Sequence, residues 1–340
     1  MTETDEKRMP FRRGGRDRHE VGRLAQRYAL VAVWAAVTVG FAIARPDTFA
    51  TTANVQTILG SQAVLVILAL ALMIPLVAGD FDLSVAFLMG LCAMIVAKLN
   101  AEMGWPLLLA IVVALAVGLG VGLVNGWLVV VVGVDSIIVT LGIGTFLLGI
   151  SEWISGSKSI TGVSPVLSEW IIGKRLLGVS LAFWYGLALC LVLWILLERT
   201  ALGARLLFVG RNRNVARLSG IQVERMRVGA FVAADLLAAA AGVVYVGGQG
   251  GVDVSSGQFF LLPAFAAAFL GATAIVPGRF NARGTIIAVY FLVTGITGLQ
   301  LLGASSFVQN LFYGGALVTA VTLSAVVRRR TEADASSAAV

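Results

Sequence analysis

Charged residues are scarce in this sequence. Asp, Glu, Lys and Arg make up 13% of its 340 residues, whereas soluble domains contain roughly 25%. Five stretches hold no charged residue at all, and they cover 48–79, 103–134, 176–197, 254–278 and 284–327. Because a helix needs about 20 apolar residues to cross the hydrocarbon core of a bilayer, the sequence predicts an all-α polytopic membrane protein instead of a soluble domain.

Histidine and cysteine are nearly missing as well. His19 is the only histidine and lies in a charged tail, so metal sites and catalytic triads built on histidine are excluded. Cys92 and Cys190 lie in separate apolar stretches, which favours small core residues over a disulfide or a metal site. The sequence also lacks the Gly-x-x-x-x-Gly-Lys-Ser/Thr motif of a P-loop, so this chain cannot bind ATP in that way. We expect no cofactor and no metal on the chain itself.

The apolar stretches divide into about ten membrane spans at their glycines, prolines and polar clusters. The 44-residue stretch is too long for one helix, and we divide it at the Gly303–Ser306 turn. The expected spans are 28–44, 55–78, 83–98, 105–124, 136–154, 179–198, 227–246, 259–276, 284–302 and 307–327. Residues 1–27 and 328–340 would be polar tails on either side of a transmembrane domain at 28–327. The Ala-Ile-Ala at the end of the first span could be a signal-peptidase site, but the long basic region before it favours a membrane helix.

The basic residues predict the orientation of these spans. An even number of spans places both termini on one side of the membrane. The two tails, residues 199–227 and residues 277–283 together hold 20 of the 25 Lys and Arg residues, and such residues collect in cytoplasmic loops. We therefore expect both termini and the 199–226 segment to be cytoplasmic. The net charge of +7 follows from this rule and does not indicate nucleic-acid binding.

The most polar internal stretch is GRNRNVARLSGIQVERMR at 210–227. One interpretation is a solvated basic loop that only sets orientation or touches anionic lipid. The other is a short amphipathic helix that docks onto another protein. Asn212 or Asn214 can cap the start of such a helix and Gly220 can end it. Its apolar residues would share one face, and they are Val215, Leu218 and Ile221.

Four segments carry motifs of a known family, in the order in which that family has them. They are AGDFDLSVAFLMG at 78–90, VNGWLVVVVGVDSIIVTLGIGTFLLGI at 124–150, LGARLLFVGRNRNVARLSGIQVERMRV at 202–228 and FLGATAIVPGRFNARGTIIA at 269–288. Together they resemble the bacterial ABC sugar-importer permeases, the family of the ribose, xylose, galactoside and autoinducer-2 systems. The likeness extends from about residue 50 to about residue 325. The chain departs from the family motifs at Asp80, Phe81, Ala86, Ala272 and Phe280.

The resemblance implies a type II ABC importer-like fold in the bacterial inner membrane. In that family the loop after the sixth span packs into a cleft on a separate ATPase subunit, which would hold ATP and Mg²⁺. The implied coupling residues are Arg211, Asn212, Arg213, Asn214, Val215, Ala216, Arg217, Leu218, Ser219, Gly220 and Ile221. The other implied partners are an extracytoplasmic substrate-binding protein and a second permease subunit, identical or paralogous. The implied solute is a monosaccharide, a sugar alcohol or a similar small polar molecule.

Polar residues at membrane depth are costly, and so they are candidates for the solute pathway. GDFDLS at 79–84 is either a water-exposed connecting turn or a broken helix whose backbone lines a cavity. A weaker echo, GGVDVSSGQF at 250–259, would fit an inverted repeat of the two halves. The pathway candidates are Asp80, Asp82, Asn125, Thr140, Thr145, Gln309 and Asn310. The simpler interpretation of each is a contact that joins packed helices.

Asp235 lies near the middle of the predicted span 227–246. Since an ionised Asp at the centre of a span costs roughly 2.5–3.5 kcal/mol, we expect it to point into the bundle, as a packing contact or as a solute contact. Other classes of function stay open. An ion-coupled secondary transporter would use Asp80, Asp82, Asp135 and Asp235 as proton or sodium sites, and a channel or a non-transporting scaffold is the third class. The basic segment and the family motifs favour the permease subunit.

Overall fold

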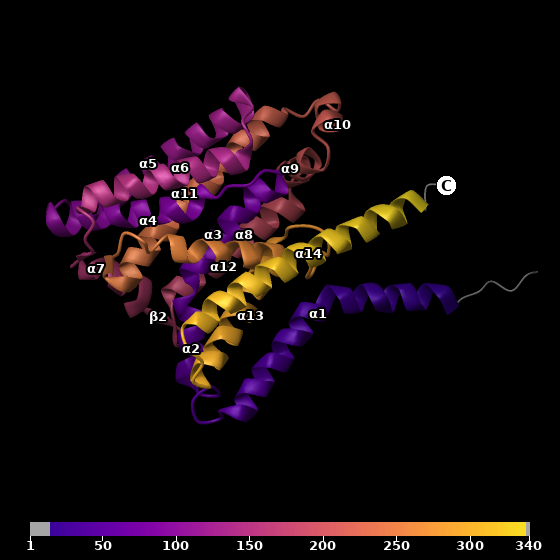
Figure 1. Cartoon of the computed structure of the whole chain (residues 1–340), viewed down its shortest axis with the longest axis horizontal. Helices are drawn as coiled ribbons and strands as arrows, with labels where there is room; N and C mark the ends of the chain where they lie inside the picture. Colours follow the sequence, from indigo (N-terminus) through magenta and orange to yellow (C-terminus); the bar gives the residue numbers. More distant parts are fainter. Residues whose placement is uncertain (1–13, 338–340) are drawn as a thin grey trace, which may run out of the picture.

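The computed structural model describes residues 14–337, and it is built almost entirely of helices (Figure 1). The helices are α1 (Gly14–Ala44), α2 (Thr52–Ser61), α3 (Ala63–Val77), α4 (Ser84–Ala97), α5 (Leu107–Gly126), α6 (Ser136–Ser155), α7 (Pro165–Ser168), α8 (Leu181–Arg199), α9 (Ala201–Arg211), α10 (Arg213–Leu218), α11 (Val223–Gln249), α12 (Gln258–Gly271), α13 (Ala282–Leu301) and α14 (Phe307–Ser337). Three short π-helical turns are η1 (Lys98–Glu102), η2 (Trp127–Val132) and η3 (Glu169–Gly173). The strands are β1 (Ile160–Thr161), β2 (Arg175–Leu176), β3 (Val179–Ser180) and β4 (Gly251–Val252), paired antiparallel as β1–β4 and β2–β3.

Nine segments of residues 14–337 are long and apolar enough to cross a membrane, one fewer than the sequence predicts. The difference is α12, which replaces the predicted span 259–276. With 14 residues it extends about 21 Å at 1.5 Å per residue, too short for a hydrocarbon core of about 30 Å. The chain continues without helix through 272–281. The Asn281 amide donates to the backbone oxygens of Gly271, Ala274 and Arg279, and these bonds stabilise the non-helical path.

Both end helices are longer than the sequence predicts. α1 begins at Gly14 instead of residue 28, and α14 continues to Ser337 instead of ending at 327. Parts of the two predicted polar tails are therefore helical. The rest of the predicted tails, residues 1–13 and 338–340, lies outside the described residues.

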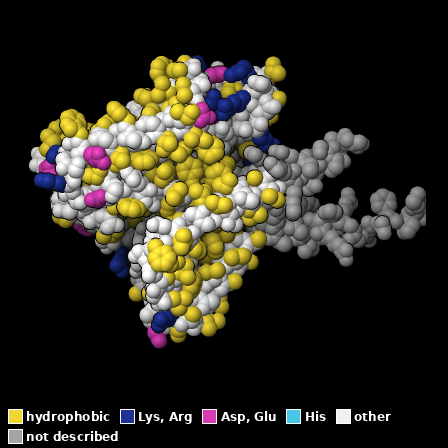
Figure 2. Space-filling model, viewed as in Figure 1, with side chains coloured by type: hydrophobic (Ala, Val, Ile, Leu, Met, Phe, Trp, Pro, Cys, Tyr) yellow, Lys and Arg dark blue, Asp and Glu magenta, His cyan; other side chains and the backbone are white. Residues whose placement is uncertain are grey.

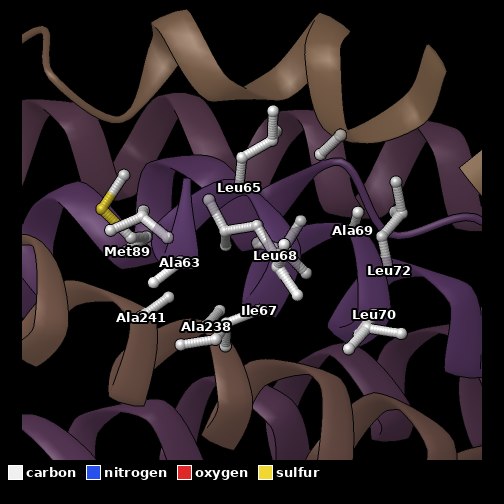
Figure 3. Packing of buried hydrophobic residues seen from close by; sticks show 14 of the residues in the cluster. Ala63, Leu65, Ile67, Leu68, Ala69, Leu70, Leu72, Met89, Ala238 and Ala241 are labelled. Atoms are coloured by element: carbon white, nitrogen blue, oxygen red, sulfur yellow. The ribbon is translucent and has the colours of Figure 1, made fainter. Parts of the chain in front are cut away.

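The core of the bundle is formed by α3, α4 and α11, with α5 and α6 on one side and α8, α12 and α13 on the other (Figure 1). Every residue of α3 is buried, and Figure 3 shows its leucines packed against Met89 of α4 and the alanines of α11. Gly242 lies where α11 crosses α4, and a Cβ there would be 2.5 Å from the Met89 carbonyl oxygen. Small residues let membrane helices approach closely enough for such packing.

The molecule has two distinct ends. α9, α10 and both ends of the described chain lie at one end, which we name the α10 end. α7, the β2–β3 hairpin and the turn between α1 and α2 lie at the other, which we name the hairpin end (Figure 1). Nine long segments alone would leave the chain ends on opposite sides. The short helix α12 and the non-helical residues 272–281 together lead the chain from β4 at the hairpin end to Arg283 beside Glu198 at the end of α8, and this tenth crossing brings both chain ends to one end. Figure 2 shows hydrophobic side chains over the middle of the visible face, whereas charged side chains gather near the two ends.

Candidate functional site

The segment 78–83, which we name the break, joins α3 to α4 without helical structure. Gly79 has a φ of +80°, a left-handed conformation that glycine adopts at little cost. Pro75 lies in the last turn of α3. The side chains of Asp80 and Asp82 are both buried. Gly79 itself is exposed and Phe81 and Leu83 are half-buried, but both carboxylates point into the protein, which does not fit a turn whose charged side chains face water.

Hydroxyl groups of α6 hold the backbone of the break. The Ser136 Oγ accepts a hydrogen bond from the Phe81 amide at 3.1 Å, and the Thr140 Oγ1 accepts one from the Leu83 amide at 3.0 Å. Buried backbone donors need such partners where no helix supplies them. Thr140 thus fixes the break. Thr145, the other α6 candidate, is exposed and donates only to the Leu141 carbonyl of its own helix.

A buried polar cluster joins the break to α5 and α11. Asp82 Oδ1 accepts from the amide and the hydroxyl of Ser84, at 3.0 and 2.6 Å. The Asn125 amide donates to Ser84 Oγ at 2.8 Å and to Asp235 Oδ2 at 2.9 Å. All four side chains are buried, so the expectation that Asp235 points into the bundle is confirmed. We name Asp82, Ser84, Asn125 and Asp235 the polar cluster.

Asp80 is bound by two arginines. Arg227 of α11 donates from Nε to Oδ2 and from Nη2 to Oδ1, both at 2.7 Å, and this bidentate geometry is the strongest form of the contact. Arg213 of α10 donates from Nη2 to Asp80 Oδ1 at 2.9 Å and to the Gly79 carbonyl at 3.0 Å. The exposed fractions of the Asp80 and Arg227 side chains are 4% and 11%. Asp80 therefore fastens the break to α10 and α11.

A close backbone contact lies beside this ion-pair cluster. A Cβ at Gly210, in the last turn of α9, would be 2.0 Å from the carbonyl oxygen of Val77. Only glycine allows the helix to approach the end of α3 so closely. The segment before α10 thus touches the end of α3 directly, and α10 itself is joined to the break through Arg213.

The short helix predicted in the polar stretch is present as α10. Asn212 caps it, since its Oδ1 accepts from the amides of Asn214 and Val215 at 3.1 Å each. Gly220, with a φ of +79°, lies in the turn that follows, as the sequence indicates. The apolar face is only partly as predicted. Leu218 is 89% exposed, but Ile221 packs against the cluster of Val209, Ala216 and Val223. Ile221 leaves the predicted face because the helix already ends at residue 218.

The other coupling and pathway candidates are separate from the break. Arg211 and Arg217 are exposed, and Arg217 pairs with Glu224. Gln309 and Asn310 are exposed in the first turn of α14, at the hairpin end. The structure does not bring them together with the polar cluster.

A cavity at the hairpin end was not identified from the sequence. Its volume is about 480 Å³, and it lies between α2, the β2–β3 hairpin, α11 and α12. The polar residues among its lining are Gln56, Thr57, Ser61, Arg175, Ser180, Tyr245 and Gln249. Gln56 and Gln249 occur within or at the end of apolar stretches. Polar amides in such stretches are the sequence feature from which this cavity could have been predicted.

Comparisons with known proteins agree on one class. A family described as "Branched-chain amino acid transport system / permease component" matches residues 54–321. The D-allose transport system permease protein of Escherichia coli (strain K12) is 28% identical over 89% of this chain and 93% of its own length. The xylose transport system permease protein of the same organism is 27% identical over 90% and 93%. The autoinducer 2 import system permease protein of Salmonella paratyphi B (strain ATCC BAA-1250 / SPB7) is 30% identical over 75% and 78%. No solved structure matches the chain.

Proposed function

This chain belongs to the branched-chain amino acid transport system / permease component family and is a permease subunit of an ABC importer, and we propose that its solute is a sugar or a similarly small polar molecule. The relatives that support this solute class are permease proteins for D-allose, xylose and autoinducer 2. The chain is a multi-pass protein of the inner membrane. All four carboxylates that an ion-coupled transporter would use have partners within the protein. Asp80 is ion-paired and Asp135 caps α6, whereas Asp82 and Asp235 accept hydrogen bonds from Ser84 and Asn125.

The observation that carries the coupling mechanism is the junction between α10 and the break. A separate ATPase subunit, which would hold ATP and Mg²⁺, docks on the exposed apolar side chains of Val215 and Leu218, with Arg211 and Arg217 beside them. Arg213 serves a different purpose, because its guanidinium is bound to Asp80. A rigid contact of this kind can transmit movement of the docked subunit to the spans as a rigid-body shift. The polar cluster would carry that shift from the break to α5 and α11.

The orientation of the subunit follows from the basic residues. The α10 end faces the cytoplasm, and the hairpin end faces the substrate-binding protein. The solute enters on the hairpin side, where the cavity of about 480 Å³ presents amides, hydroxyls and a guanidinium of the kind that hydrogen-bond a polyol. A second permease subunit completes the transport path.

The test of the coupling assignment is Leu218→Asp. Leu218 is 89% exposed, so this variant should fold and assemble in the membrane as the wild type does. A charge buried at the contact with the ATPase would have no partner, at a cost of several kcal/mol. We expect ATPase stimulation by loaded binding protein to be lost. The matched control is Leu218→Met, which keeps an uncharged apolar side chain of similar size at the same exposed position; it should keep that stimulation. Full stimulation of an assembled Leu218→Asp complex would contradict the assignment.

A further inference from the structure

A groove of about 390 Å³ lies between the start of the α1 span, the second half of α8 and the first turns of α13. α8 contributes residues at i, i+3, i+4 and i+7, which form one stripe along the helix. The residues that line the groove are Arg27, Tyr28, Leu187, Cys190, Leu191, Trp194, Ile275, Arg283, Ile286 and Ile287. Apart from two arginines and a tyrosine hydroxyl, this surface is apolar or aromatic.

The two arginines lie at the same end of the groove. Arg27 is the residue at which the α1 span begins, and its carbonyl accepts a hydrogen bond from the Ile275 amide at 3.0 Å. Arg283 is in the first turn of α13. The Nε atoms of both are buried and have no hydrogen-bond partner among the described residues. A ligand in the groove does not reach these buried Nε atoms, but no Nη atom of either arginine is buried and unpartnered. The Arg27 guanidinium makes no hydrogen bond to a described residue, and Arg283 uses only Nη2. The free Nη donors point to an anionic ligand that binds between the two guanidinium groups.

The charge around this end is positive. Arg283 Nη2 donates to Glu198 Oε2 at 2.6 Å. Among the described residues, Glu198 is the acidic side chain that pairs with an arginine of the groove. Arg199 and Arg283 both lie over the ring of Trp194, with centroid distances of 5.4 and 5.1 Å. Three arginines against one glutamate leave an excess of two positive charges, enough to attract an anion.

The apolar part of the groove covers about two thirds of the depth of one leaflet. From Leu187 to Trp194 the stripe on α8 extends seven residues, or about 10 Å, compared with roughly 15 Å of hydrocarbon in half a bilayer. Leu187 and Leu191 are exposed, so the groove is open at the side where acyl chains would lie. Trp194, with its indole beside the arginines, is placed as aromatic residues are at a membrane interface.

We propose that this groove binds one anionic phospholipid, with its phosphate between Arg27 and Arg283 and an acyl chain along the stripe on α8. The charge complementarity and the apolar groove below it select a lipid over a free phosphate, which would use only the arginine end. Basic pockets between membrane helices are typical sites for anionic headgroups. The lipid would add to a sparse contact between α1 and the rest of the protein, because only 6% of the residues in the α1 span are buried. Bound lipid therefore holds α1 against α8 and α13.

The experiment uses the full chain in its assembled complex, titrated with phosphatidylglycerol or phosphatidylcholine. Native mass spectrometry measures bound lipid, and thermal unfolding measures stabilisation. We expect saturable, stabilising binding of phosphatidylglycerol and much weaker binding of phosphatidylcholine. Arg27→Gln breaks no ion pair of the described residues, and at about 1 kcal/mol per basic residue it should weaken phosphatidylglycerol binding about fivefold. The double variant Arg27→Gln with Arg283→Gln should weaken it about 30-fold.

Two controls separate lipid binding from a folding defect. Arg27→Lys with Arg283→Lys keeps both charges and should keep most of the binding. Arg45→Gln removes an exposed arginine at the other end of the α1 span and should have no effect. Equal binding of both lipids would overturn the proposal, as would unchanged phosphatidylglycerol binding by Arg27→Gln and by the double variant. So would a photo-crosslinker at Leu191 that captures a second protein chain instead of lipid.

Discussion

Replacing Asp80 by Asn should both destabilise the protein and uncouple it. The variant removes the charge that binds Arg227 and Arg213, but it leaves the size of the side chain unchanged. Arg227 is only 11% exposed, so it would become a buried cation without a counter-ion. Breaking a buried ion pair from one side costs about 3–5 kcal/mol. Arg213, at 41% exposed, can turn toward water and should add at most about 1 kcal/mol.

A surface ion pair of the same region is the matched control. Arg217 and Glu224 are both largely exposed, and exposed pairs contribute about 0–1 kcal/mol. Glu224→Gln should therefore change the free energy of unfolding by less than about 1 kcal/mol. Unfolding in mixed detergent micelles, followed by circular dichroism, measures both variants. ATPase stimulation by loaded binding protein, measured in the assembled complex, should fall for Asp80→Asn and stay near wild type for Glu224→Gln.

A double-mutant cycle isolates the contact. Arg227→Gln alone should also lower the free energy of unfolding. The double variant, Asp80→Asn with Arg227→Gln, should lower it by less than the sum of the two single effects, because the double variant leaves neither buried charge of this pair without its partner. Additive effects would refute the claim that these residues stabilise the fold as a pair. An Asp80→Asn protein as stable and as well coupled as wild type would refute the whole account of the junction.

Two further predictions concern orientation and the polar cluster. Ser159→Cys and Asn214→Cys both lie at exposed positions, and an impermeant thiol reagent added from outside should label the first and spare the second. The native Cys92 and Cys190 are buried and give little background labelling. The reverse labelling pattern would contradict the orientation. Asp235→Asn should keep assembly and transport, since an amide can still bond to Asn125, whereas Asp235→Leu should lower complex yield because Asn125 then loses a buried partner, at about 1–3 kcal/mol. If both variants assemble but neither transports, Asp235 contacts the solute, and a harmless Asp235→Leu would show that the bond to Asn125 does not stabilise the fold.

Several features of this protein could be predicted from the sequence because they depend on local composition. Charge-free stretches of at least 22 residues can be stable only in a bilayer, so the membrane class and most of the spans follow directly. The α10 helix is local as well: Asn212 caps residues that follow it directly, and Gly220 lies in the turn that ends it. The family motifs indicated the permease class before any contact was known.

Only the tertiary structure decided which polar residues meet. Asp80 is 133 residues from Arg213 and 147 from Arg227, and Asn125 is 110 residues from Asp235. Such pairs depend on how the spans pack against one another, which neither hydropathy nor helical periodicity encodes. The shortness of α12 depends on both kinds of contact. Asn281 binds the nearby oxygens of Gly271 and Ala274, and the Ile275 amide donates to the distant Arg27 carbonyl of α1; together they stabilise backbone that hydropathy alone assigns to a helix. In a bundle whose spans are mostly apolar, the few polar side chains set the register, and their partners are visible only once the helices are packed.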